Sequence, residues 1–401
     1  MAQKGSVWKK GSSWFLRYRD DFLIDGEIRR KPVCSFLAKY SDHYRRKSDL
    51  AELAEQKMAG VKQAAKCPHA SDSFTVYVEE VYLPYVRRTM KPSTYAGYVG
   101  YWRRYLKPRV VKYALRDFSI AVVSSLLEDI AKMHSLNMDT IGKVRSILSG
   151  IFTYAMAKGN YPGRSAADNP ASRALIPEAA TKPKPTIAAS RDEVKAILAH
   201  LAAEGLLLGR AAVALVAYTG VRPGECRGLR WEEWDRTAAQ IKILRSVWHA
   251  VEGTTKTEQS NRYVTVTAEL RAILLELWKS QGSPIAGYIL ARAKGDRVNL
   301  DNMSKREIAP ALLRCAACKR EESAEHKNHE FERDETLPRW HGWYSLRRFH
   351  GTQVRLKSGN SETMSKALGN SKEVADAHYN KPTKVLPDVR KAVNSAMRGL
   401  S

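Results

Sequence analysis

Four side chains in the second half of the chain are of the types that chemistry on a phosphate group requires. Arg222 follows a predicted helix break at Gly220, a position from which a guanidinium can meet an anion. Arg347 lies near the start of another predicted helix, and Tyr379 near the C-terminus is either a packing residue or a nucleophile. Lys256 lies in the connection between two predicted strands, where a lysine is more often simply solvated.

The physical requirements of phosphodiester cleavage fit these residue types. A phosphodiester under in-line attack accumulates negative charge on its non-bridging oxygens. Two guanidiniums donate paired hydrogen bonds and fixed positive charge to such a group, so Arg222 and Arg347 together would form an electrostatic clamp. A phenol that attacks the phosphorus stores the energy of the broken linkage in a covalent bond. This chemistry requires neither a metal ion nor a nucleotide.

Short elements with clear end signals are predicted to position these side chains. Residues Ser361 to Leu368 are predicted to form a helix that Gly369 terminates, and Ser371 is the predicted N-cap of a further short helix leading to the tyrosine. An apolar helix, AAVALVAY, ends just before the first arginine. The alternating runs QIKILRSV and NRYVTVT predict two strands that flank the lysine.

Residues 190–401 are predicted to form one domain that contains all four side chains. The sequence from Ser190 to Glu193 is a capping box, and apolar residues follow it at helical spacing. The preceding stretch, residues 169–189, contains four prolines and little periodicity, which favours an interdomain linker.

Two further modules are predicted ahead of this linker. Residues 1–66 predict a three-stranded sheet followed by a helix, which is either a DNA-reading module or a simple appendage. Residues 72–168 contain four helical stretches, which predicts an all-α domain and a fold that is mainly α with small β-sheets (α+β). Its second helix carries Trp102, Arg103 and Arg104. A core stripe would explain the aromatic residues, whereas a helix lying along a phosphate backbone would also explain both arginines.

The balance of charge favours a polyanionic partner. Lysine and arginine number 67 against 42 acidic residues, a formal net charge of +25, and the basic runs are spread over the whole length. That distribution suits a protein that neutralises many phosphates of double-stranded DNA better than a set of solvated lysines. No apolar run approaches the roughly 20 residues of a membrane span. MAQKGSVWKK lacks the apolar core of a signal peptide, so we expect no membrane contact and a cytoplasmic location.

Two cysteines and two histidines lie close together between the predicted helix NMSKREIAPALLR and Arg347. Cys315-x2-Cys318 is followed by His326-x2-His329, a set that can hold a tetrahedral zinc ion. The seven residues between the two pairs are fewer than in a zinc finger. The segment is therefore either a structural zinc site or a polar surface loop with reduced cysteines.

These motifs, in this order, resemble those of the tyrosine recombinase or phage integrase family. TGVRPGECRGLRWEEWD resembles the family's first box, whose catalytic arginine falls on Arg222. TKTEQSNRYVTVT resembles the hairpin whose lysine falls on Lys256. YSLRR replaces His-x-Leu-Arg-Arg, so the second catalytic arginine falls on Arg347. LGNSKEVADAHY replaces Leu-Gly-His with a nucleophile nine residues later, which falls on Tyr379.

The resemblance implies a site-specific recombinase that integrates or excises a mobile element through a 3′-phosphotyrosyl intermediate. Lys256 would be the general acid for the departing 5′-hydroxyl, and Arg348 would contact DNA. The enzyme would act as a homotetramer on two duplex sites, with a host DNA-bending protein or an excisionase as further partners. Residues 1–66 would bind arm sites and residues 72–168 core sites. Residues 190–401 would form a mixed α/β catalytic domain with the Cys/His insert at 315–329 and a C-terminal tail.

Two positions depart from the family pattern. Tyr344 replaces the histidine of the second box, and Asn370 replaces the later histidine. Both side chains can donate a hydrogen bond to a phosphate oxygen, but neither is a good base near neutral pH. Removal of the proton from Tyr379 would then either be slower or be left to His341, His350 or His378.

These departures leave an alternative function open. A catalytically degraded protein of the same fold would act only as a sequence-specific DNA-binding protein. A type IB topoisomerase would share the chemistry, but it relaxes DNA without pairing specific sites, and the two upstream modules favour recombination.

Overall fold

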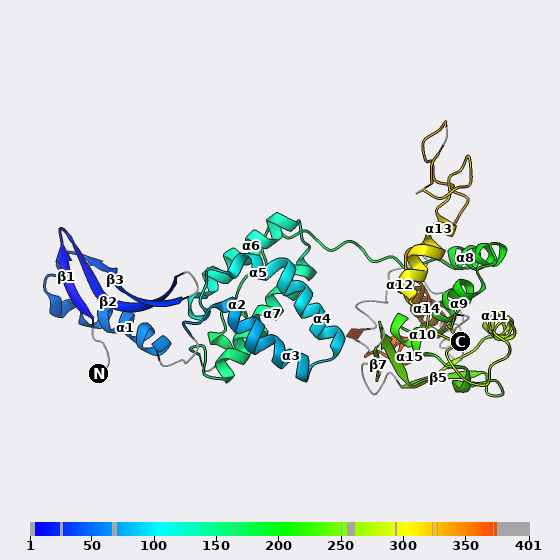
Figure 1. Ribbon diagram of the computed structural model, residues 1–401, viewed down its shortest axis with the longest axis horizontal. Helices are drawn as coiled ribbons and strands as arrows, with labels where there is room; N and C mark the ends of the chain where they lie inside the picture. Colours follow the sequence, from blue (N-terminus) through cyan, green and yellow to red (C-terminus); the bar gives the residue numbers. More distant parts are fainter. Residues whose placement is uncertain are drawn as a thin grey trace, which may run out of the picture. The chain divides into compact units, whose positions relative to one another are not determined.

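The computed structural model describes residues 5–24, 27–65, 70–163, 165–249, 251–254, 261–292, 295–322, 324–326, 328–371 and 373–374. The chain divides into two compact units, residues 1–184 and 185–401, each with its own buried core (Figure 1). No helix in these ranges combines the length and the apolar character needed to cross a membrane.

The first unit begins with a three-stranded antiparallel sheet in the order β1-β2-β3. Its strands are β1 (Ser6–Lys10), β2 (Ser13–Ile24) and β3 (Glu27–Lys39), and helix α1 (Ala51–Ala65) follows them. Alternation along β2 places Trp14 and Leu16 on one face, where they pack with Leu50 and with Met58 of α1. The predicted sheet and helix are confirmed.

Four helical segments form the rest of the first unit. The first comprises α2 (Phe74–Val76), a π-helical turn (Tyr77–Tyr82) and α3 (Leu83–Thr89). The second comprises α4 (Pro92–Tyr101), a π-helical turn (Trp102–Leu106) and α5 (Lys107–Val110). Helices α6 (Ile120–His134) and α7 (Met138–Ala157) complete the set. Their shared core is rich in aromatic rings; those of Phe74 and Phe118 are tilted against each other with centroids 4.2 Å apart.

Much of the stretch predicted as a linker is packed. Ala171, Ala174 and Ala180 are buried in the core of the first unit, and Asn169 donates hydrogen bonds to α7. Ala189 is buried in the core of the second unit. The prolines do end the helical pattern, but the small apolar residues between them find places in the two cores.

The second unit is built around α9 (Leu207–Thr219), which is buried along most of its length. It packs against α8 (Arg191–Ala203), α11 (Ala268–Ser280) and α14 (Trp343–Ser358). Shorter helices are α10 (Pro223–Gly228), α12 (Leu300–Met303), α13 (Ala309–Leu312) and α15 (Ser361–Leu368). The predicted capping box is present, because Ser190 Oγ accepts the Glu193 N–H at 3.1 Å.

Two small antiparallel sheets complete this unit. One has the order β4 (Trp234–Asp235), β5 (Gln240–Ile243), β8 (Arg262–Thr265), and the other pairs β6 (Arg245–Trp248) with β7 (Val251–Thr254). The run QIKILRSV, predicted as one strand, therefore divides at Leu244 and contributes to both sheets. The alternation of apolar and polar residues is interrupted at Leu244 and Arg245, which is the point where the pairing partner changes.

The predicted helix ends near the C-terminus are confirmed. Helix α15 covers Ser361–Leu368, and Gly369 follows it with a φ of +62°. Ser371 Oγ accepts the N–H of Val374 at 3.4 Å, as expected of an N-cap. Tyr379, His378, Lys256 and the C-terminal tail lie outside the described residues. The fold as a whole is mainly α with small β-sheets, as predicted.

Candidate active site

A sharp helix break presents Arg222. Helix α9 ends at Thr219, and Gly220 follows in the left-handed conformation with a φ of +65°. A Cβ atom on this glycine would lie 2.5 Å from the ring of His350, so the position has no room for a side chain. Arg222 is then the N-cap of α10, with Pro223 as the first helical residue.

Glu225 is the buried anion that holds this arginine in place. Its side chain is 1% exposed. Its carboxylate oxygens accept hydrogen bonds from the Arg222 guanidinium at 2.5 Å, from the Arg222 backbone N–H at 2.9 Å and from Arg262 Nη2 at 3.2 Å. Burial alone would raise the pKa of the Glu225 carboxyl, but the charges of Arg262 and Arg222 bring it below its usual value. The carboxylate therefore stays ionised at neutral pH. Arg262 also donates from Nε to the carbonyl of Ala367 at 3.2 Å, which connects β8 to α15.

Arg347 and Asn370 complete the cluster. Arg347 is fully buried and donates to the carbonyl of Gly220, to the carbonyl of Leu368 at 2.8 Å and to Asn370 Oδ1 at 3.2 Å. The same Asn370 oxygen accepts a hydrogen bond from Arg222 Nη2. Two guanidiniums from distant parts of the sequence thus converge on one amide oxygen. Asn370 Nδ2 is buried and has no hydrogen-bond partner among the described residues.

This arrangement is suited to a negatively charged oxygen. The cluster contains three arginines, Arg222, Arg262 and Arg347, and one glutamate, so it retains an excess of positive charge. Paired guanidinium donors match the geometry of carboxylate and phosphate oxygens. The cluster can therefore bind and polarise a phosphodiester.

The histidines near the cluster differ in their fitness to accept a proton. His350 packs against Gly220, and burial, reinforced by the charge of Arg347, lowers its pKa to about 4. His350 is therefore neutral at pH 7 and a weak base. His341 Nε2 lies 3.4 Å from Glu193 Oε1 at the start of α8. His378 lies outside the described residues.

Comparisons with known proteins agree on one fold. The Tn1549 transposon integrase in complex with a circular intermediate DNA is 15% identical with a TM-score of 0.58, covering 81% of this chain and 99% of that chain. A lambda integrase dimer bound to a core site is 14% identical with a TM-score of 0.53, covering 95% and 97%. The chain has the fold of the tyrosine recombinases.

A sequence relative carries the same family name. The "Tyrosine recombinase XerC-like" protein of Caldanaerobacter subterraneus subsp. tengcongensis is 24% identical over 55% of this chain. The match spans 62% of the length of that curated relative. No protein-family model matches the sequence.

Within the tyrosine recombinase fold, three of the predicted catalytic residues come together. Arg222, Arg347 and Asn370 meet through shared hydrogen bonds. Tyr344 lies one helical turn before Arg347 and is 50% exposed, without a hydrogen-bond partner in the described part of the chain. Sequence reasoning did not assign Glu225 a role. Its position three residues after the N-cap arginine, as in a capping box, was the available signal.

The predicted DNA contact of Trp102 is wrong. Its indole is 1% exposed in the core of the helical domain, and Nε1 donates to Glu79 Oε1 at 3.0 Å. Arg103 and Arg104 on the same turn are exposed. Arg348 donates from Nη1 to the carbonyl of Ile187 at 3.1 Å, which joins the segment before α8 to α14. DNA contacts by these three arginines stay predictions.

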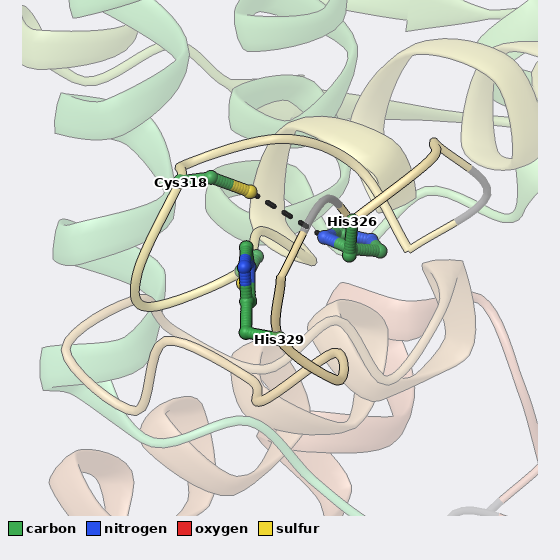
Figure 2. Close-up of side chains that lie close together, drawn as sticks. Cys318, His326 and His329 are labelled. Carbon is green, nitrogen blue, oxygen red and sulfur yellow. Dashed lines mark hydrogen bonds between the residues drawn. The ribbon is translucent and has the colours of Figure 1, made fainter.

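The predicted metal-ligand set also converges. The ligand atoms of Cys315, Cys318, His326 and His329 all lie within 4.8 Å of one another. Cys318 Sγ lies 3.4 Å from His326 Nδ1, as Figure 2 shows, and Cys315 Sγ lies 3.2 Å from His329 Nε2. The backbone N–H of Cys318 is the main cause that lowers the pKa of the Cys315 thiol to about 6.

Proposed function

We propose that this chain is a site-specific DNA recombinase that cuts and rejoins duplex DNA through a 3′-phosphotyrosyl intermediate. The observation that carries the proposal is the convergence of Arg222 and Arg347 on one point, with a buried carboxylate behind them. The Tn1549 and lambda integrases of similar fold are described in complex with DNA, and lambda integrase also as a tetramer bound to a Holliday junction. By analogy we propose DNA as the partner here, with a homotetramer as the active assembly that integrates or excises a mobile element.

The geometry suggests how a phosphate would enter the site. A non-bridging oxygen between Arg222 and Arg347 would replace the Asn370 oxygen as the acceptor of both guanidiniums. A rotation of the Asn370 side chain would then turn Nδ2 toward the same phosphate. Nδ2 is a buried donor without a partner in the described residues, so this contact would also satisfy it. Asn370 would thus accept hydrogen bonds from the two arginines when no phosphate is bound, and would donate one to the phosphate when it is bound.

The covalent step assigns roles to two residues outside the described part of the chain. The Tyr379 oxygen attacks the phosphorus, a P–O bond forms, and the bond to the 5′-oxygen breaks. Lys256 gives its proton to that departing oxygen. In the return step the 5′-hydroxyl of the partner strand attacks the phosphotyrosine and releases the phenol. The phenol proton of Tyr379 must leave as the P–O bond forms. Tyr344 and Asn370 supply hydrogen bonds but no base, and His350 is a weak base, so the proton passes to His341 or His378.

A covalent-adduct assay tests this function. The full-length protein is incubated with a pool of nicked duplexes that contain a randomised segment, and protein-bound DNA is recovered under denaturing conditions. We expect adducts with the wild-type protein and none with Tyr379→Phe. Adducts that persist in Tyr379→Phe would refute the nucleophile assignment.

A second candidate is a protein of the same fold that binds DNA without cutting it. The absence of a basic side chain at positions 344 and 370 favours it. The same pool separates the two functions. Selective retention of duplexes under native conditions, with no adduct from the wild-type protein, would establish the binding-only function.

A further inference from the structure

A short stem supports the cysteine–histidine cluster between α13 and α14. The N–H of Ala316 donates to the carbonyl of Glu332 at 2.7 Å, and the N–H of Asp334 donates to the carbonyl of Arg314 at 2.8 Å. Residues 314–316 and 332–334 therefore run antiparallel, and the residues between them form a loop that extends beyond α13 (Figure 1). We call residues 314–334 the insert.

We propose that Cys315, Cys318, His326 and His329 of the insert bind one structural Zn²⁺ ion. A Zn–S bond of about 2.3 Å and a Zn–N bond of about 2.0 Å at tetrahedral angles place sulfur and nitrogen about 3.5 Å apart. The sulfur–nitrogen distance is 3.4 Å between Cys318 and His326 (Figure 2) and 3.2 Å between Cys315 and His329. Both cysteines are free thiols, so the sulfurs are available to a metal.

The surroundings of these side chains fit metal ligands better than a hydrogen-bonded loop. The Cys315 sulfur accepts backbone N–H groups of Cys318, Glu332 and Ala317, a set of donors that stabilises a thiolate. The His326 ring bonds only the Cys318 sulfur, and its Nε2 is buried without a partner among the described residues. The ring nitrogen that faces the cluster is therefore Nδ1, and its neighbour is a cysteine sulfur, as expected for a zinc ligand in a set of two cysteines and two histidines.

The chemistry of the donor set selects the metal and its role. Two thiolates and two imidazoles in a tetrahedral arrangement suit Zn²⁺. Four protein ligands leave no position for water or substrate, which is the pattern of a structural site. Cys315 lies within the first segment of the stem and His329 lies three residues before the second segment, so one ion closes the loop at its base.

The ion is expected to fold the insert and not the domain. The buried apolar core of the second unit includes Leu312 before the insert and Trp343 after it, but none of the insert residues that the structure describes. The start of α14 is fixed separately, because Trp343 Nε1 donates to the carbonyl of Leu300 at 3.0 Å and Trp340 Nε1 to Ser304 Oγ at 2.8 Å. Protein without the metal should therefore keep its helices.

Metal analysis of the full-length protein tests the site directly. The wild-type protein and the control Cys34→Ser, which changes an exposed cysteine of β3, should each contain about one zinc per chain after dialysis. Cys318→Ser should retain less than a tenth of that amount. Folded wild-type protein that stays metal-free after incubation with zinc, or Cys318→Ser that keeps its zinc, would overturn the proposal.

Two further readouts do not depend on DNA cleavage. Cobalt in place of zinc should give the visible absorption of a tetrahedral thiolate complex in the wild-type protein and not in Cys318→Ser. Arg320 lies at the surface of the insert. Chelation should unfold the insert and so make the chain susceptible to trypsin after Arg320, while the far-ultraviolet circular dichroism stays the same. Tryptic cleavage there that is equally fast with and without metal would also refute the site.

Discussion

Glutamine in place of Glu225 removes a buried negative charge that two active-site arginines share. Removing one partner of a buried ion pair typically costs about 3–5 kcal/mol, because the remaining charge stays in a poorly solvated place. The carboxylate is 1% exposed and contacts Arg222 at 2.5 Å and Arg262 at 3.2 Å. The amide keeps one acceptor oxygen, so we expect Glu225→Gln to lower the free energy of unfolding by about 3 kcal/mol.

Scanning calorimetry of the full-length chain measures this effect. A unit of about 200 residues loses roughly 2–4 °C of melting temperature per kcal/mol, which predicts a shift of about 10 °C. Glu362→Gln is the matched control, because it breaks the Glu362–Lys366 pair on α15, whose side chains are 67% and 76% exposed. Such exposed pairs contribute about 0.3–0.5 kcal/mol. A shift no larger than that of the control would show that the arginines do not depend on Glu225.

A double substitution separates coupling from general damage. Glu225→Gln combined with Arg262→Gln should destabilise the unit by less than the sum of the two single changes, because each removes the partner of the other. Additive effects would mean that the two side chains do not interact energetically, whatever their distance.

Two further predictions concern the core helix and the buried histidine. Trp102→Ala should cost about 3–5 kcal/mol in unfolding measurements, whereas Arg103→Ala should leave stability within about 0.5 kcal/mol and reduce the salt slope of DNA binding by about 1. His350 has a pKa of about 4 against an ordinary 6.5, so its contribution to stability is complete above pH 6.5 and is lost as the pH falls toward 4. Between these limits the wild-type protein should lose up to about 3 kcal/mol more than His350→Gln, measured by denaturant unfolding at a series of pH values. Equal pH profiles of the two proteins would contradict the burial of a neutral imidazole.

Local signals explain which parts of the fold could be predicted. Gly369 and Ser371 mark helix ends within a few residues, and the structure places α15 at the predicted bounds. Gly220 likewise marks the end of α9 at Thr219, two residues before Arg222. Each of these predictions needed only residues within one turn of the chain.

Pairings across the sequence could not be predicted in this way. Arg262 lies 37 positions after Glu225, and their ion pair exists only because β8 and α10 meet in the folded unit. The error at Trp102 is of another kind. Residues 102, 105 and 106 lie on one helical face and are buried, whereas Arg103 and Arg104 are exposed. The helical period alone could have separated the aromatic from the basic side chains.

Asn370 shows why a departure from a family pattern is hard to interpret from residue type alone. A neutral imidazole has one acceptor nitrogen, and an imidazolium has none, whereas an amide oxygen has two lone pairs. Only the amide can therefore accept from Arg222 and Arg347 at the same time, as the structure shows. Asparagine in place of the family's histidine removes a base, but it adds a neutral acceptor that holds two like charges together. In the sequence, Asn370 only marks the absence of the family's histidine. In the structure, its side-chain oxygen accepts hydrogen bonds from both arginines.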